Sequence, residues 1–425
     1  MTAQLSETDA AAAEIAAGVP AAPAAAAAPK VRAGGGHLHY IDIVRVLTVA
    51  LVIAVHMTGQ QTITPTLTAG AVLTVAHVSR EVFFLLTAFV LTYSYRDRPV
   101  RPLSFWRKRF LFVAVPYVAW SVIYFLADNS RLDPVSSAIV TLLHDLSNGA
   151  ARYHLYFLLV SMQIYLVFPL LRAMLKATRR WHTLLLVVCA AYQLTFYLAV
   201  QQNWTLGPLT GWLRLPDAWL SSYLGFVIAG GIAAWHAEGL VAWVRSHLSY
   251  VFAGSAATIG VGIAVFLGQA LIGGQNPLIA SNVFQPVVVV ESVGVAMAFL
   301  ALGLVWQDCG RPAKRWVRNG ADASFGIYLA HPLLIQGLLW GASLSGLTTL
   351  AQHAPPDLVL LIELVVIVPL LYVLAGTIAT LARHTPFSLA IAGRARLRAR
   401  KAPATVEHTP LPFTNRPLPT QGGTR

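Results

Sequence analysis

The sequence predicts an all-α membrane protein, a polytopic bundle of about ten transmembrane helices with both termini in the cytoplasm. The 425 residues are 56% hydrophobic and only 11% charged, whereas soluble domains carry about 25% charged residues. The mean hydropathy is +0.64. Ten apolar segments are each about long enough to cross a hydrocarbon core of roughly 30 Å. They cover residues 40–58, 70–94, 109–127, 154–172, 182–200, 218–235, 249–271, 285–306, 323–344 and 358–382.

The distribution of basic residues between these segments supports the count. With the N-terminus placed in the cytoplasm, 25 of the 30 lysines and arginines fall in cytoplasmic loops and tails and three in outer loops. The remaining two, Arg45 and Arg80, lie within spans. Cytoplasmic loops of membrane proteins carry such an excess of Lys and Arg. The net charge of +13 is thereby explained by topology, and we expect no nucleic-acid partner.

Three regions follow from composition. Residues 1–38 are rich in Ala and Pro and lack the basic start of a signal peptide, so we expect a disordered cytoplasmic tail. Residues 39–385 form the transmembrane domain. Residues 386–425 form a basic, Pro-containing cytoplasmic tail, whose arginines we expect to contact anionic lipid headgroups.

The cysteine and histidine patterns indicate neither a disulfide framework nor a metal site. Cys189 lies inside an apolar span and Cys309 in a basic loop. The 13 histidines form no HxxxH motif and no His/Cys cluster. We therefore predict no metal and no permanently bound cofactor.

The first span carries the clearest functional signal, because it contains two ionisable residues on one face. Arg45 and His56 are eleven residues apart, which on an α-helix is about three turns plus 20° and about 16 Å along the axis. Ionisable groups inside a membrane are costly and are functional candidates. In the predicted orientation Arg45 lies near the cytoplasmic end and His56 in the outer part.

Five motifs along the chain resemble those of the acyltransferase family 3 integral membrane proteins, in the same order and over about residues 38–385. The first is the Arg, ten residues, His pattern of the first span. The motifs read YIDIVRVLTVALVIAVHMTG at 40–59, EVFFLLTAFVLTYSY at 81–95, FWRKRFLFVAVPY at 105–117, HLYFLLVSMQIYLVFPLL at 154–171 and SFGIYLAHPLL at 324–334. Two positions depart from the family pattern: Thr87-Ala88 stands where Ser-Gly is usual, and Arg80-Glu81 is more charged.

The resemblance implies an acyl-CoA-dependent O-acyltransferase, with acetyl-CoA the usual donor substrate and a sugar or other hydroxyl as acceptor. It implies that Arg45 and His56 are the essential pair. Histidine suits a general base, because its usual pKa near 6.5 lets it take and return a proton at neutral pH. We expect His56 to deprotonate the acceptor hydroxyl as it attacks the thioester. An arginine fork suits a CoA phosphate or pantetheine carbonyl.

Further site residues are predicted around this pair. Glu81 either orients His56 or binds the acceptor in a catalytic role, or it only pairs with Arg80 to set helix packing. The basic residues of the 105–117 motif either hold the CoA phosphates or only fix topology; they are Arg107, Lys108 and Arg109. Three residues at suitable depth either bind the acceptor or satisfy one another in the bundle; they are His154, Tyr328 and His331.

Two other function classes are compatible with the sequence. The protein could be a transporter or exporter of a small polar metabolite, with buried charged residues along its pathway. It could also be a non-catalytic partner of a glycan-synthesis complex. The sequence does not name the acceptor, which could be a cell-surface glycan or a glycosylated natural product, nor the acyl chain length. We expect a multi-pass protein of a bacterial plasma membrane, embedded in the lipid bilayer and able to form a homo-oligomer.

Overall fold

The computed structural model describes residues 37–60, 66–128 and 135–397, and all regular structure within them is helical. Most of the predicted 1–38 tail and residues 398–425 of the predicted basic tail lie outside this part of the chain. The helices are α2 (His39–Gly59), α3 (Leu67–His77), α4 (Ser79–Tyr95), α5 (Pro102–Asp128), α6 (Val135–Asn148), α7 (Tyr156–Ala177), α8 (His182–Gln201), α9 (Thr210–Leu213), α10 (Leu224–Trp235), α11 (Ala237–Ser246), α12 (Leu248–Leu267), α13 (Pro277–Ala280), α14 (Pro286–Asp308), α15 (Lys314–Leu344), α16 (Leu347–His353), α17 (Pro356–Ile362), α18 (Val368–Ala382) and α19 (Ser388–Ala392). Short 3-10 or π turns are η1 (Arg179–Trp181), η2 (Gly207–Leu209), η3 (Pro216–Ala218), η4 (Leu220–Tyr223), η5 (Gly268–Ile272) and η6 (Glu363–Ile367).

The predicted fold class is confirmed. In the described part of the chain nine helical segments are long and apolar enough to cross a membrane, and α3 with α4 counts as one of them. A tenth span results if Leu220–Trp235 and Ala237–Ser246, which meet at an 86° bend, are taken together. Each of these nine spans, and the bent pair as the tenth, corresponds to one of the ten predicted segments. The cytoplasmic placement of the termini stays a prediction.

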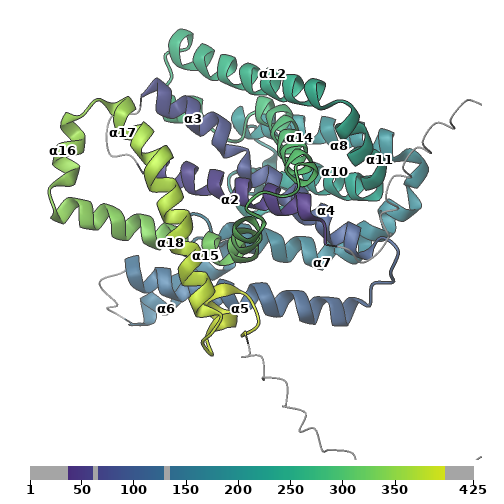
Figure 1. Ribbon diagram of the computed structural model, residues 1–425, viewed down its shortest axis with the longest axis horizontal. Coiled ribbons are helices and arrows are strands. Elements are labelled where there is room, and N and C mark those ends of the chain that lie inside the picture. Colours follow the sequence, from purple (N-terminus) through teal and green to yellow (C-terminus); the bar gives the residue numbers. More distant parts are fainter. Residues whose placement is uncertain (1–36, 61–65, 129–134, 398–425) are drawn as a thin grey trace, which may run out of the picture.

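Helix α2 lies at the centre of the bundle (Figure 1). It packs against α14, α15, α3, α4 and α18. Asp42 in its first turn and His56 in its last turn are placed where the helix dipole favours an acid and a base respectively. Most of α2 between Tyr40 and Thr58 is therefore buried or half-buried among other helices, whereas Gly59 at its end is exposed.

Helices α4 and α10 approach each other closely because a glycine lies between them. A Cβ added at Gly230 of α10 would lie 2.1 Å from the backbone oxygen of Leu85 in α4. Small residues allow such backbone contact between membrane helices. This contact fixes α4, which carries several residues of the site, against the rest of the bundle.

Several elements differ from the sequence-based expectation. Helix α5 begins at Pro102, seven residues before the predicted segment, and the helix pair α10 and α11 continues past the predicted end at residue 235. Helix α6 was not anticipated; it has no buried residue and packs on α5 at the edge of the bundle (Figure 1). Helix α15 begins at Lys314, nine residues before the predicted apolar segment, because polar residues continue the helix outside the span. Helix α19 lies within the predicted basic tail and packs against α5, α15 and α18.

Candidate active site

His56 of α2 opens into a cavity of about 370 Å³, here called the histidine cavity. Residues of α2, α3, α4, α7, α13 and α15, of the 3-10 turn η3 and of the segments at 153–154 and 281–283 surround it. Its lining includes Val52, Val55, His56, Gly59, His77, Ser79, Arg80, Phe83, Tyr153, His154, Tyr156, Phe157, Asp217, Ser281 and Tyr328. The His56 imidazole makes no hydrogen bond with a described residue. Its ring nitrogens are not among the fully buried polar atoms that lack a partner, so they are accessible from the cavity. Its nitrogens are thus available to a molecule in the cavity.

The three predicted acceptor-site residues gather around His56. The His331 ring stacks on His56 with centroids 5.2 Å apart, and His154 lies 5.4 Å from His331 and 5.2 Å from Tyr328. The ring of Tyr153, which sequence analysis did not single out, lies 4.5 Å from His56. Tyr153 directly precedes His154 in the same loop. The structure brings these residues together, while their roles stay predictions.

Hydrogen bonds fix the tautomer and orientation of part of this cluster. The Nδ1 of His331 lies 2.7 Å from the backbone oxygen of Tyr328 and donates to it, so its Nε2 carries the lone pair. The Tyr328 hydroxyl donates to the backbone oxygen of His154. Burial, with the nearby His331 adding to it, holds the pKa of His154 well below its usual range. Burial therefore favours the neutral imidazole of His154.

Glu81 lies behind the histidine cavity and not on its wall. Arg80 donates from Nε and Nη2 to Oε1 of Glu81 at 3.0 and 2.8 Å, and the Tyr197 hydroxyl donates to the same oxygen at 2.8 Å. The buried Arg80–Glu81 ion pair, one of the two alternatives that the sequence left, is thus present. Within the described part of the chain Glu81 makes no contact with His56. A catalytic role of Glu81 has no support from this geometry.

Arg80, rather than Glu81, presents its side chain to the cavity. Its Nη1 donates to Oδ1 of Asp217 at 2.6 Å, and its guanidinium lies 4.9 Å from the ring centre of Tyr223 and 4.4 Å from that of Phe284. The loop residue Asp217 is separated from Arg80 by 137 positions, so only the tertiary fold shows this bridge. The guanidinium is held in place and offers a fixed positive edge to the cavity.

Arg45 opens into a second cavity of about 250 Å³, here called the arginine cavity. Three arginines line it, together with apolar and aromatic side chains. The lining is Arg45, Phe83, Leu86, Thr87, Val90, Leu91, Arg109, Phe112, Val113, Tyr165, Ser324, Phe325, Gly393 and Arg394. Arg45 makes no hydrogen bond or ion pair with a described residue, and the buried Nε of Arg109 also has no hydrogen-bond partner. Arg394 lies 3.7 Å from Oδ1 of Asp322, so Arg45 and Arg109 are the guanidinium groups of this cavity without an ion pair among the described residues, and such groups suit an anionic ligand.

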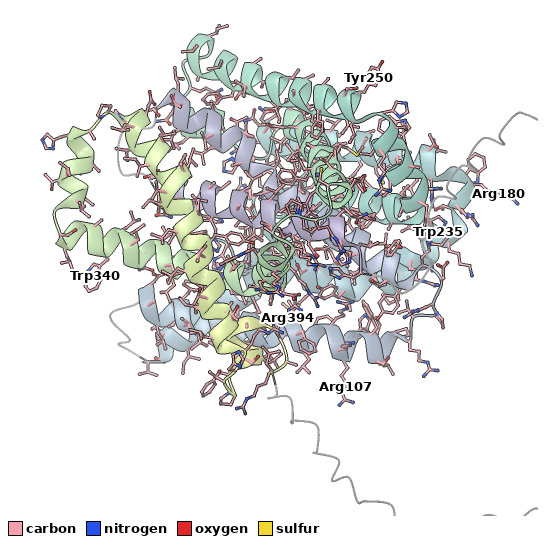
Figure 2. All side chains as sticks on the ribbon, viewed as in Figure 1. Arg107, Arg180, Trp235, Tyr250, Trp340 and Arg394 are labelled. Carbon is pink, nitrogen blue, oxygen red and sulfur yellow. The ribbon has the colours of Figure 1, made fainter. Side chains whose placement is uncertain are left out.

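The predicted basic set is divided by the structure. Arg109 faces the arginine cavity, with its guanidinium 5.8 Å from the ring centres of both Phe105 and Tyr165. Arg107 and Lys108 are exposed, and Figure 2 shows Arg107 pointing away from the bundle. The reason is helical spacing, because three consecutive residues of α5 cannot face the same side.

Arg394 of this cavity was missed, because its segment reads as a basic tail. Helix α19 folds back onto α5, and Gly393 (φ +59°) ends it in a conformation that favours glycine. A Cβ on Gly393 would lie 2.1 Å from the ring of Phe325. The short apolar run Ser388–Ala392 followed by Gly393 is the sequence signal that could have placed Arg394.

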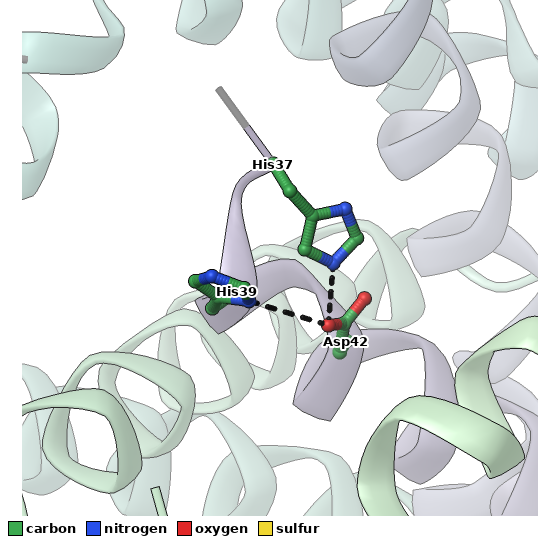
Figure 3. Close-up of side chains that lie close together, drawn as sticks. All are labelled: His37, His39 and Asp42. Carbon is green, nitrogen blue, oxygen red and sulfur yellow. Dashed lines mark hydrogen bonds and ion pairs between the residues drawn. The ribbon is translucent and has the colours of Figure 1, made fainter. Parts of the chain in front are cut away.

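Asp42 does not pair with Arg45 within the described residues. Its buried carboxylate accepts from His37 Nε2 at 2.7 Å, with His39 Nδ1 4.0 Å away, as Figure 3 shows. This leaves Arg45 free for the cavity. The ligand atoms of the three residues lie within 4.8 Å of one another, so this group could hold a metal ion, whereas the sequence predicted no metal site.

The two cavities are stacked along the same four helices. Helix α2 contributes Arg45 to one cavity and His56 to the other, and α4, α7 and α15 likewise contribute to both linings. Phe83 of α4 belongs to both linings. The two ends of the first span thus line different cavities, while the roles predicted for Arg45 and His56 stay predictions.

The fold and the site define a polytopic helical membrane protein with paired histidine and arginine cavities inside its bundle. The sequence profile of the acyltransferase family 3, described as an acyltransferase domain, matches residues 38–382. Since this match covers most of the chain, the protein belongs to that family of membrane acyltransferases. No curated protein and no solved structure gives a significant match.

Proposed function

We propose that the protein is a membrane O-acyltransferase that moves an acyl group, acetyl in the first instance, from acyl-CoA to a hydroxyl of a carbohydrate or glycosylated acceptor. The observation that carries this proposal is the stacking of the two cavities. The donor's phosphates bind at the arginine cavity, and the acceptor hydroxyl reaches His56. The acyl arm then spans about 16 Å, the rise of eleven helical residues.

The histidine cavity supports the base role of His56. The acceptor oxygen attacks the thioester carbonyl, its proton passes to the free His56 imidazole, and the C–S bond breaks as the ester C–O bond forms. The proton then goes to the departing CoA thiolate. Stacking against His331, itself held by the Tyr328 backbone, orients the base.

The arginine cavity supports an anionic donor. Arg45, Arg109 and Arg394 provide charge-assisted donors, which are the groups that phosphates prefer. The aromatic side chains of the histidine cavity, including Tyr153, Tyr156 and Tyr328, offer hydroxyls and ring faces suited to a sugar. We propose in addition that the protein lies in a bacterial plasma membrane, has both termini in the cytoplasm and forms a homo-oligomer.

The test compares His56→Ala with His353→Ala, a matched control because His353 is exposed on α16. Membranes containing each variant receive labelled acetyl-CoA, and glycans and secondary metabolites of the cells are analysed by mass spectrometry. We expect the acyl mass increment and the label to disappear only with His56→Ala. Undiminished transfer by a normally inserted His56→Ala protein would refute the assignment, and loss of metabolite transport without any acyl change would favour a transporter.

A further inference from the structure

We propose that Phe83 is a movable partition between the two cavities, which the acyl arm must displace and which limits the length of the acyl group. This inference rests on the proposed function for its substrate, but the partition itself is a property of the bundle. Phe83 is the single residue of the described chain that lines both the histidine cavity and the arginine cavity.

The placement of Phe83 follows from one face of α4. Ser79 and Arg80 line the histidine cavity, whereas Thr87 and Val90 line the arginine cavity. Residues three or four apart share a helix face, so this face runs from one cavity to the other. Phe83 lies midway along it, and its ring stands where the two cavities would otherwise join.

The other side of the partition is rigid. The Phe83 ring meets Phe157 edge-on at 4.8 Å between centroids and Tyr328 at 6.3 Å. Phe157 is buried and stacked on Phe84 at 4.5 Å, and Tyr328 is buried and held through its hydroxyl by the His154 backbone. Phe83 is only half-buried, and no hydrogen bond can restrain a phenylalanine ring. It is the part of the partition that can change rotamer.

Two consequences follow for the reaction. In the closed position Phe83 separates His56 from solvent entering through the arginine cavity, which protects a thioester from hydrolysis. In the open position the ring must share the passage with the pantetheine arm and the acyl chain. An acetyl group adds little volume, whereas a hexanoyl group adds four methylenes at the point where Phe157 and Tyr328 cannot yield.

The first experiment tests the partition without acyl transfer. Exposed Cys309 is replaced by Ser, and a reporter thiol is introduced as Val55→Cys in the histidine cavity or Thr87→Cys in the arginine cavity. Sealed vesicles that expose the Arg45 side receive an anionic, membrane-impermeant methanethiosulfonate. We expect labelling of Thr87→Cys but not of Val55→Cys, and at least tenfold faster labelling of Val55→Cys when Phe83→Ala is added. The control Phe252→Ala, at an exposed position of α12, should leave the Val55→Cys thiol unlabelled when it is combined with that reporter.

The partition is refuted if Phe83→Ala leaves Val55→Cys protected, or if Val55→Cys is already labelled as fast as Thr87→Cys with Phe83 present. Failure to label Thr87→Cys would also overturn it, because the arginine cavity would then not open to that side. None of these results depends on whether the protein transfers acyl groups.

The second experiment tests the length limit with purified protein and its native membrane extract as acceptor. One methylene in a closed pocket typically changes specificity by about tenfold or more. We therefore expect Phe83→Ala to raise the hexanoyl-CoA to acetyl-CoA rate ratio at least tenfold and Phe83→Trp to lower both rates. An unchanged ratio would refute the length limit. If no acyl-CoA reacts with any variant, the proposed function fails while the labelling result still decides the partition.

Discussion

Removal of the Arg80 guanidinium is expected to destabilise the protein strongly, because it leaves a buried carboxylate without its cation. Glu81 is 0% exposed and receives two hydrogen bonds from Arg80. Breaking a buried ion pair from one side costs about 3–5 kcal/mol. After Arg80→Met only the Tyr197 hydroxyl would still contact the Glu81 oxygen, so we expect a loss in that range.

The second carboxylate on Arg80 provides an internal contrast. The Asp217 side chain is 51% exposed, and solvent screens its interaction with the guanidinium. Exposed ion pairs contribute about 0–1 kcal/mol. Asp217→Asn should therefore lower the free energy of unfolding by about 1 kcal/mol or less, although its hydrogen bond is shorter than those to Glu81.

The assay is denaturant unfolding in detergent micelles of Arg80→Met, Asp217→Asn, Glu81→Gln and the double variant Arg80→Met/Glu81→Gln. The double variant removes the stranded charge, so it should regain most of the stability that Arg80→Met loses. Equal losses for Arg80→Met and Asp217→Asn would refute the reasoning. So would a double variant no more stable than Arg80→Met.

Three further predictions follow from the same geometry. Arg45→Lys keeps the positive charge but loses the bidentate guanidinium, so the KM for acetyl-CoA in steady-state kinetics should rise about tenfold. The control Arg107→Ala, at an exposed position, should leave this KM unchanged. The pKa of His154 is lowered by burial, so the folded protein binds fewer protons than the unfolded chain below pH 6.5. Stability should consequently be constant above that pH and fall as pH decreases below it, and a pH series of unfolding measurements should show a smaller fall for His154→Gln. Gly230→Ala would place a methyl group against the Leu85 backbone and should lower the midpoint of thermal unfolding by several degrees. The control Gly254→Ala, with open space around it, should not lower it. Similar midpoints for both variants would contradict the close α4–α10 contact.

Much of the architecture could be predicted because hydropathy and charge act locally along the chain. Each of the ten predicted segments corresponds to a helical segment of the structure. For most segments the predicted and observed ends agree within a few residues. The exceptions have local causes. Helix α6 (Val135–Asn148) has only 14 residues and is too short for a span, and polar residues from Lys314 onward extend α15 beyond its apolar segment.

The composition of the site could be predicted only in part. The spacing of Arg45 and His56 predicted one shared face, and the structure opens that face into two stacked cavities. Of the basic triplet at 107–109, the sequence could not tell which member faces inward. Asp217 carries no local signal that associates it with Arg80, and for Arg394 the sequence offers only the short apolar run that ends at Gly393.

The sequence by itself determined that this protein is a helical membrane protein, through its hydropathy, and that it belongs to the acyltransferase family 3, through its ordered motifs. It also marked Arg45 and His56 on the first span as functional candidates, because burying charge in a bilayer is costly. Only the tertiary structure decided which groups surround them. The pairing of Glu81 with Arg80, the gathering of His154 and His331 around His56, and the position of Phe83 between the cavities depend on contacts between helices far apart in the chain. Apolar helices can pack against one another in many ways, so periodicity within a single helix cannot specify those contacts.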